Sequence, residues 1–214
     1  EVTTVATYSA TDADGTATLT YSITGGTDSD LFSINSATGA LTFSSAPDYE
    51  NPGCGAGDDS NTCTVVLTVS DGTNTDTITV TATVTDLNEH SPVFSAGSAS
   101  AVNVAEGSTA VGTYTATDSD GTATQTYSIV AAGTDAASVD HDLFTVNAGT
   151  GALTFSSAPD YETPGCGAGN DANVCVVILS VTDGANTDTI TVTATVTEVT
   201  ATADIASVST DAAH

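Results

Sequence analysis

The chain is built from short runs in which apolar and polar residues alternate. The clearest runs are "TLTYSI" (18–23), "ALTF" (40–43), "TVVLTVS" (64–70) and "DTITVTATVT" (76–85). Because a period of two places the apolar side chains on one face of an extended chain, each run predicts a β-strand. No stretch of ten or more residues has the 3.6-residue period of an amphipathic helix. The pattern therefore predicts an all-β protein.

Turn signals separate these runs. "DADG" (12–15), "SATG" (36–39) and "SDGTN" (70–74) combine Gly with Asp, Asn or Ser, which favour tight turns. About seven short strands in each 100 residues are typical of a β-sandwich.

The sequence contains two copies of one unit. "TDADGTATLTYSI" (11–23) returns as "TDSDGTATQTYSI" (117–129), and "DTITVTATVT" (76–85) returns at 188–197. The second copy carries six additional residues around 133–141, an insertion that a loop tolerates at little cost.

The repeat predicts three segments. We expect a first domain at residues 1–90, a second at 91–200 and a C-terminal tail at 201–214. The two domains are expected to be consecutive β-sandwiches.

Charge narrows the possible partners. The chain has 27 Asp and Glu residues, no Lys or Arg, and a formal charge of −27. No carboxylate can pair with Lys or Arg, and nucleic acids and anionic membrane surfaces are poor partners, since phosphate binding needs basic residues. No run of 18 apolar residues predicts a membrane span. Acid-rich surfaces are also typical of halophilic or marine proteomes, but this does not explain where the acids cluster.

The four cysteines form two matching pairs. Cys54 and Cys63 in the first copy correspond to Cys166 and Cys175 in the second, both with C-x8-C spacing. A metal site is disfavoured because neither a C-x2-C motif nor an adjacent His is present. We predict one disulfide within each copy and, from it, an oxidising extracellular compartment.

Acidic residues gather at four places in each copy. These are "DAD" or "DSD" early, "DYE" in the middle, the Asp of "SDG" or "TDG" late, and "DLNEH" (86–90) between the copies. Alternate residues of an extended segment point to the same side, so such pairs can address one ion. Since hard cations take six to eight oxygen ligands, the pattern predicts calcium as the cofactor. Asp is also common in turns for its own hydrogen bonds, which is the alternative for each motif alone.

The joint order of these motifs resembles the cadherin repeat. The resemblance covers nearly the whole chain and rests on "TDSDG" (117–121), "LFTVNAGTGALTF" (143–155), "PDYE" (159–162) and "VTDG" (181–184), with "DLNEHSPVF" (86–94) between the copies. It implies two tandem Greek-key sandwiches of about seven strands each. It also implies an extracellular surface protein, of prokaryotic origin in our interpretation, that binds calcium at the junction between repeats.

The resemblance implies a ligand set at this junction. Leu87 and His90 would contribute backbone carbonyls, while Glu89 and His90 replace the Asp and Asn that the family usually has there. Glu1 matches the family's early Glu less well, because its spacing to Val5 is one residue shorter than that of Glu106 to Val111. The expected ligands are Glu1, Asp48, Glu50, Asp86, Leu87, Asn88, Glu89, His90, Asp118, Asp120 and Asp183.

Two further half-sites are expected at the ends of the chain. One consists of Asp12, Asp14 and Asp71 in the first copy. The other consists of Glu106, Asp160, Glu162 and Glu198 in the second copy. It is poorer in ligands, since Thr200 and Ala201 stand where the junction has Asn88 and Glu89.

No catalytic arrangement stands out. The three His residues accompany no G-x-S-x-G motif and no Cys–His pair, so we expect no enzyme. We expect a calcium-binding adhesive or structural protein, whose partners include copies of itself and possible cell-surface proteins or glycans. The alternative is a carbohydrate-binding or accessory module of a larger secreted enzyme or adhesin.

The two ends predict self-assembly. The first copy has no residues matching "AVNVAEG" (101–107), which we expect to form the first strand of a sandwich. The tail, 201–214, has about that length and contains Ile205 and Val208. We expect one copy's tail to add this strand to the next copy, giving a head-to-tail filament. The alternative is a segment of a longer tandem array, in which the same junction is covalent.

Overall fold

The computed structural model describes residues 3–13, 15, 18–121, 124–131 and 138–200. The chain divides into two compact units, which we call unit 1 (Glu1–Leu87) and unit 2 (Asn88–His214). Each unit is described by itself.

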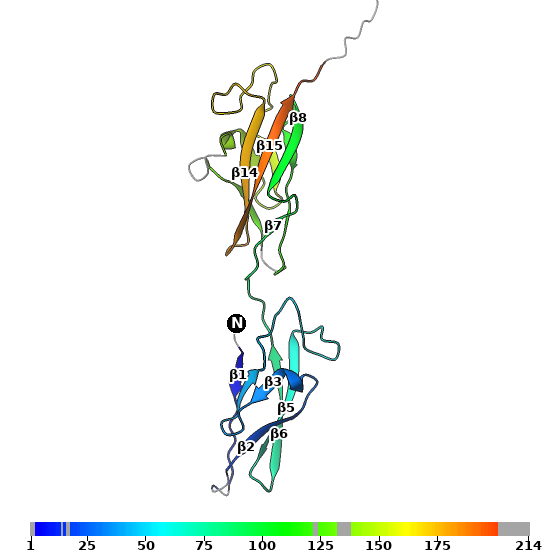
Figure 1. Cartoon of the computed structure of the whole chain (residues 1–214), viewed down its shortest axis with the longest axis vertical. Helices are drawn as coiled ribbons and strands as arrows, with labels where there is room; N and C mark the ends of the chain where they lie inside the picture. The colour runs from blue at the N-terminus through cyan, green and yellow to red at the C-terminus, as the bar shows by residue number, and fades with distance from the viewer. Residues whose placement is uncertain (1–2, 14, 16–17, 122–123, 132–137, 201–214) are drawn as a thin grey trace, which may run out of the picture. The chain divides into compact units, whose positions relative to one another are not determined.

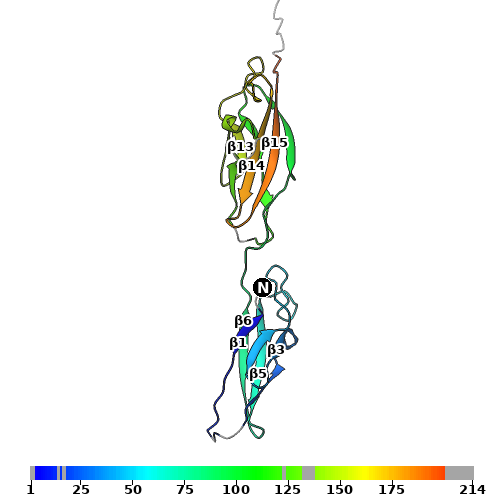
Figure 2. The ribbon, with the colours of Figure 1, turned by 60° about the vertical axis from the view of Figure 1, so that its left-hand side comes forward.

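Unit 1 consists of two three-stranded sheets (Figures 1 and 2). One sheet has the order β1-β4-β3 and the other has the order β2-β5-β6, with all pairs antiparallel. The elements are β1 (Thr4–Thr7), β2 (Thr20–Gly25), a 3-10 helix η1 (Ser29–Leu31), β3 (Phe32–Ile34), β4 (Ala40–Phe43), β5 (Thr62–Ser70) and β6 (Thr75–Thr83).

Unit 2 repeats this plan with three added strands. Its sheets have the orders β11-β14-β15-β8, β12-β13-β9 and β10-β7. The elements are β7 (Val93–Phe94), β8 (Ala99–Ala105), β9 (Ala110–Thr113), β10 (Ala116–Thr117), β11 (Thr126–Ile129), η2 (His141–Leu143), β12 (Phe144–Val146), β13 (Ala152–Phe155), β14 (Val174–Thr182) and β15 (Thr187–Thr197).

The core of each unit follows from the alternation in the sequence. In β15, Ile190, Val192, Ala194 and Val196 are buried, while the Thr residues between them are only partly buried. β-Branched residues suit both faces of such a strand, because they pack well on a pleated surface. The predicted all-β class with two tandem sandwiches is therefore confirmed, and no α-helix lies in the described parts of the chain.

Both predicted disulfides are present. Cys54 is bonded to Cys63 and Cys166 to Cys175, with Cα–Cα distances of 4.8 and 4.9 Å. All four cysteines are buried against the core of their unit.

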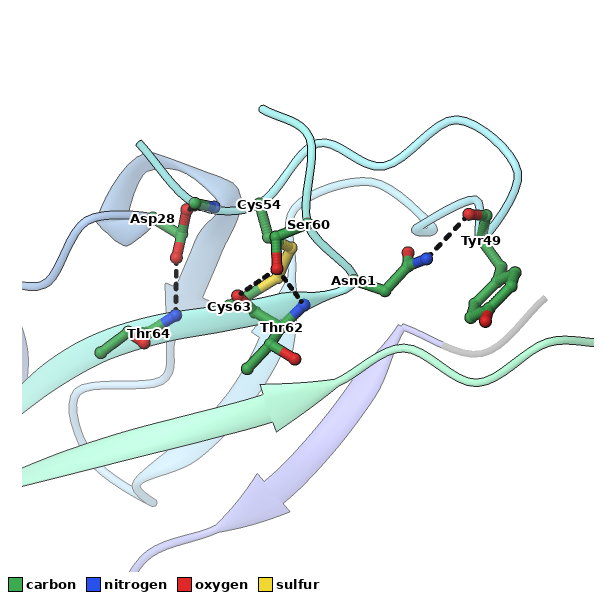
Figure 3. The surroundings of a disulfide bond; sticks show 9 residues. Asp28, Tyr49, Cys54, Ser60, Asn61, Thr62, Cys63 and Thr64 are labelled. Atoms are coloured by element: carbon green, nitrogen blue, oxygen red, sulfur yellow. Dashed lines mark hydrogen bonds between the residues drawn. A yellow bond between two sulfur atoms is a disulfide. The ribbon is translucent and has the colours of Figure 1, made fainter. Parts of the chain in front are cut away.

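A buried aspartate fastens each disulfide loop to the sandwich. The Asp28 carboxylate, only 3% exposed, accepts the backbone N–H of Gly55 at 2.6 Å. It also accepts the backbone N–H of Thr64 at 2.6 Å (Figure 3). In unit 2, the Asp140 carboxylate likewise accepts the backbone N–H of Gly167 and of Val176. Charged acceptors make the stronger hydrogen bonds of a protein, so these aspartates hold the loop where the disulfide meets β5 or β14.

Among the described residues, no helix is both long and apolar enough to cross a membrane.

Candidate calcium sites

Three carboxylates converge at one end of unit 2. Asp118 and Asp120 lie just after β10, and Asp183 directly follows β14. Each offers one carboxylate oxygen, and these oxygens lie within 4.8 Å of one another. We call this the Asp118 cluster. Asp183 is 65 positions from Asp118 along the chain. Folding brings the three together because β11, which follows Asp120, pairs with the end of β14 at Thr126↔Thr182.

Two oxygens of the Asp118 cluster are buried without a hydrogen bond. These are Asp118 Oδ2 and Asp120 Oδ1, which have no hydrogen-bond partner among the described residues. Asp120 as a whole is only 4% exposed. Its other oxygen accepts the backbone N–H of His90 at 2.9 Å, and His90 Nε2 lies 4.0 Å from Asp120 Oδ1. Buried carboxylate oxygens without donors are costly unless a cation faces them.

An amide completes this oxygen-rich surface. The end group of the Asn88 side chain lies 3.0 Å from Asp183 Oδ2 and 2.8 Å from Asp120 Oδ2. With its nitrogen turned toward the carboxylates, Asn88 donates two hydrogen bonds to them. With its oxygen turned toward them, it adds a ligand of the type that calcium takes. The donor set therefore fits a hard cation.

Backbone donors orient Asp183. Its Oδ1 accepts the N–H of Asn186 at 2.6 Å and that of Ala185 at 2.7 Å. The Asn186 N–H is the largest cause that lowers the pKa of Asp183 below its ordinary value. The Asn186 side chain also donates to the backbone carbonyl of His90 at 2.8 Å. This carbonyl, which we expected to be a ligand, keeps a second lone pair, because a carbonyl accepts two bonds.

A second cluster lies elsewhere in unit 2. Glu106, Asp160 and Glu162 bring one carboxylate oxygen each within 4.8 Å of the others. Glu106 accepts the backbone N–H of Val199 at 2.7 Å and of Tyr161 at 3.1 Å. The Val199 donor is the main reason that the pKa of Glu106 is lowered.

The pKa of Glu162 moves in the opposite direction. The backbone N–H of Glu162 itself lowers this pKa. Lost hydration and the negative charges of Glu106 and Asp160 together raise it by more, so the pKa lies above its ordinary value. Repulsion of this kind is what a bound cation relieves. Glu198, expected here from the sequence, is exposed and does not belong to the cluster.

In unit 1, Asp12 and Asp71 line one hollow. The hollow has a volume of about 280 Å³ and also contains Asn74 and Asp76. Asp71 accepts the N–H of Thr73 and of Asn74, both at 2.6 Å, and the Asn74 N–H is the largest cause that lowers the pKa of Asp71. Asp14 and Glu1, the other expected ligands at the ends of unit 1, lie outside the described residues.

The remaining expected ligands divide between the units. In unit 1, Asp48 is exposed and accepts the N–H of Glu50 at 3.0 Å, whereas Glu50 and Asp86 are partly buried. Leu87 is 64% exposed. In unit 2, Glu89 is exposed.

Sequence reasoning missed the supporting asparagines. Asn186 holds both Asp183 and the His90 carbonyl, and Asn74 holds Asp71 in the same way in unit 1. The signal was available, because "SDGTN" (70–74) and "TDGAN" (182–186) place an Asn three residues after the Asp in both copies. Asp28 and Asp140 were also missed, since nothing in the local sequence indicates that they are buried.

Solved structures share this fold across nearly the whole chain. The structure of human protocadherin-24 EC1-2 is 20% identical, with a TM-score of 0.66 over 93% of this chain and 90% of that one. The extracellular cadherin domains 3-6 of protocadherin gamma B2 are 18% identical, with a TM-score of 0.70 over 92% of this chain and 48% of that one. Mouse cadherin-23 EC22-24 is 20% identical, with a TM-score of 0.60 over 85% of this chain, which spans about half (53%) of that one.

Sequence comparison agrees for the first unit. A search of curated proteins found no match. The family model for the cadherin domain matches residues 1–87, the stretch that makes up unit 1. The same motifs recur in unit 2, where they hold the clustered carboxylates. Residues 1–87 therefore belong to the cadherin-domain family, and the chain as a whole has the fold of consecutive cadherin repeats.

Proposed function

We propose that this chain is an extracellular, calcium-binding structural or adhesive protein, in which calcium stiffens the junction between the two units. The observation that carries this proposal is the Asp118 cluster, with two buried carboxylate oxygens that have no hydrogen-bond partner among the described residues. The family is one of adhesion modules, and two disulfides agree with an oxidising compartment.

Electrostatics favour a cation over bare carboxylates. The carboxylate oxygens of the Asp118 cluster lie within 4.8 Å of one another, so any two of these carboxylates repel each other when both are ionised. Three such pairs oppose folding unless a proton or a cation intervenes. No Lys or Arg exists in the chain to supply that charge.

The ligand chemistry favours calcium among the cations. The cluster offers carboxylates and an amide but no thiolate, which disfavours zinc and copper. Magnesium demands octahedral geometry and retains its water, whereas calcium accepts six to eight oxygens in varied geometry.

In this proposal, ligands from both units share the ions. Unit 2 would contribute the Asp118 cluster, Asn88 and Glu89. Unit 1 would contribute Asp48, Glu50, Asp86 and the Leu87 carbonyl. Calcium would then act mechanically, since carboxylates from two domains that share an ion restrict the angle between the domains.

The proposal extends to assembly of the protein. The cluster of Glu106, Asp160 and Glu162 in one copy would contribute half of a further site. The hollow of Asp12 and Asp71 in the next copy would contribute the other half. Such a contact joins different surfaces and does not close on itself, so it propagates as a filament.

Calorimetry of calcium binding tests the calcium proposal. We expect the unaltered protein to bind calcium, and the double variant Asp118→Asn with Asp120→Asn to lose its tightest binding step. The matched control is Asp142→Asn, because the Asp142 side chain is 89% exposed and belongs to no cluster. If the double variant binds calcium as the unaltered protein does, or if the unaltered protein does not bind calcium, the proposal is wrong.

A further inference from the structure

The two units differ in what lies beside one strand of nearly identical sequence. The same ten residues, "DTITVTATVT", occur at 76–85 and 188–197; β15 contains all ten and β6 contains the first eight. In unit 2, β15 pairs with β14 on one side and, in parallel, with β8 on the other, from Thr191↔Ala99 to Thr197↔Ala105. In unit 1, β6 pairs with β5, and no described residue pairs with its other side.

Without a neighbour on this side, one apolar side chain of β6 is exposed to solvent. Ile190 of β15 is completely buried, whereas its counterpart in β6, Ile78, is 51% exposed. Since the strands have the same sequence, the difference comes from what covers them. An unpaired strand edge beside an exposed apolar side chain is a template for another strand.

In unit 2, Phe94 closes the region next to this edge. Phe94 is 1% exposed, its ring lies 6.1 Å from that of Tyr127, and its backbone N–H donates to Asp188 Oδ2 at 2.9 Å. The following residue, Ser95, donates to the carbonyl of Thr115 at 2.9 Å. Phe94 therefore inserts a side chain into the core while its backbone is held on both sides.

Unit 1 has a hollow at the corresponding place. It measures about 170 Å³, and its lining includes Tyr8, Tyr21, Leu67, Val69, Asp76 and Ile78. By the repeat, these are the counterparts of Tyr114, Tyr127, Leu179, Val181, Asp188 and Ile190. Asp188 accepts the N–H of Phe94, and the other five belong to the same core cluster as Phe94. We call this hollow the Phe94-type socket.

The frame of the socket is the same in both units. The Tyr21 hydroxyl accepts the N–H of Ala10 at 3.0 Å, as the Tyr127 hydroxyl accepts that of Ala116 at 2.9 Å. Asp76 Oδ1 accepts the N–H of Thr77 at 2.8 Å, as Asp188 Oδ1 accepts that of Thr189. The socket is thus formed before an apolar side chain enters it, which reduces the ordering cost of binding.

We propose that the Phe94-type socket holds Ile205 of a second copy, with the residues after Ile205 running parallel to β6 as an added strand. This gives the contact for the head-to-tail assembly proposed above, and it does not depend on calcium binding. The backbone N–H of Ile205 would donate to Asp76, in the way that Phe94 donates to Asp188.

Chain spacing supports this occupant. Phe94 follows Thr85 by nine residues, and Ile205 follows Thr197, the counterpart of Thr85, by eight. A tail that leaves the end of β15 can therefore present Ile205 to the next copy at nearly the spacing by which the connecting segment presents Phe94 to unit 2.

The composition of the tail also suits a strand. Residues 201–214 contain no Pro, so every residue can donate a backbone hydrogen bond, and no Gly, which weakens strands. The tail itself lies outside the described residues. Nine residues follow Ile205, enough to extend along most of β6, since a strand rises about 3.3 Å per residue.

Two single variants test the contact from its two sides. Ile205→Asp places a charge on the inserted side chain, and Ile78→Asp places one at the rim of the socket, where the half-exposed side chain allows the substitution. We expect each to raise the concentration needed for assembly by at least about thirtyfold, as for a central interface residue. Val139→Asp is the matched control, because Val139 is 46% exposed on unit 2 and belongs neither to the lining of the socket nor to the strands at the end of β15. Ile205→Phe should assemble at lower concentration than the unaltered protein, since Phe fills this site in unit 2.

Mixing separates this contact from other kinds of association. The Ile205→Asp variant keeps an unaltered socket, and the Ile78→Asp variant keeps an unaltered tail. An equal mixture can therefore form only one contact per pair of chains, so it should form dimers and no longer species. Light scattering and sedimentation are measured with calcium, and with chelator in high salt, which screens the charge of −27. If the unaltered protein shows no calcium binding in calorimetry while the mixture still forms dimers, only the calcium proposal is wrong. A monomeric unaltered protein in both conditions, assembly of Ile205→Asp equal to that of the control, or a mixture without dimers would overturn the socket proposal.

Discussion

Truncating the same isoleucine in β6 and in β15 should cost very different amounts of stability. Ile190 is completely buried in unit 2, so Ile190→Ala removes buried methyl and methylene groups and leaves a cavity. Such changes cost about 2–5 kcal/mol of the free energy of unfolding. Ile78 is 51% exposed, so Ile78→Ala loses about half of the transfer energy and leaves no closed cavity, which amounts to about 1 kcal/mol.

The comparison is well controlled because the sequence around both positions is the same. Both substitutions are made together with Ile205→Asp, so that no added strand covers Ile78. Calorimetric unfolding reports the midpoints, and hydrogen exchange of peptides from β5 and β14 assigns each transition to its unit. Since 1 kcal/mol shifts the midpoint of a domain of this size by about 4–8 °C, we expect a fall of about 10 °C or more for unit 2 and of a few degrees for unit 1.

Equal falls for the two variants would refute the reasoning, because they would mean that β6 is covered in the same way as β15 within a single copy. The same pair in the background of the intact tail gives the converse expectation. There, Ile78→Ala should become more costly as the protein concentration rises, since assembly buries Ile78.

Further predictions concern calcium, the buried aspartates and the disulfides. Removing calcium with a chelator should lower the midpoint of unit 2, and the loss should approach about 2.7 kcal/mol when the starting calcium is a hundred times the dissociation constant; a midpoint that does not depend on calcium would contradict this. Asp28→Asn should destabilise unit 1 by about 2–3 kcal/mol, because the amide is uncharged and its nitrogen cannot accept, so one of the two backbone N–H groups of Gly55 and Thr64 loses its acceptor; urea unfolding measures the change, and Asp30→Asn is the control. Replacing Cys54 and Cys63 by Ala should cost about 2–3 kcal/mol, in line with the short loop that their bond closes, and a change within experimental error would show that the Asp28 contacts alone hold the loop.

The sequence alone determined the local structure and the inventory of ligands. Alternation with a period of two is a property of the strand itself, so "DTITVTATVT" predicted a strand in both copies, and both copies form one. The pairing within each C-x8-C motif was also predictable, because the residues are close in the chain and duplicated. Clustered Asp residues pointed to a cation, since no basic residue is available to neutralise them.

Only the tertiary structure decided what surrounds each of these segments. Burial depends on neighbours from distant parts of the chain, so one strand sequence is fully covered in unit 2 and half exposed in unit 1. For the same reason, Asp28 and Asp30 look alike in the sequence, yet Asp28 alone is buried beneath the disulfide loop. The Asp118 cluster needed the fold as well: β11 pairs with the end of β14 at Thr126↔Thr182, which brings the segment of Asp118 and Asp120 close to Asp183, although they are far apart in the chain.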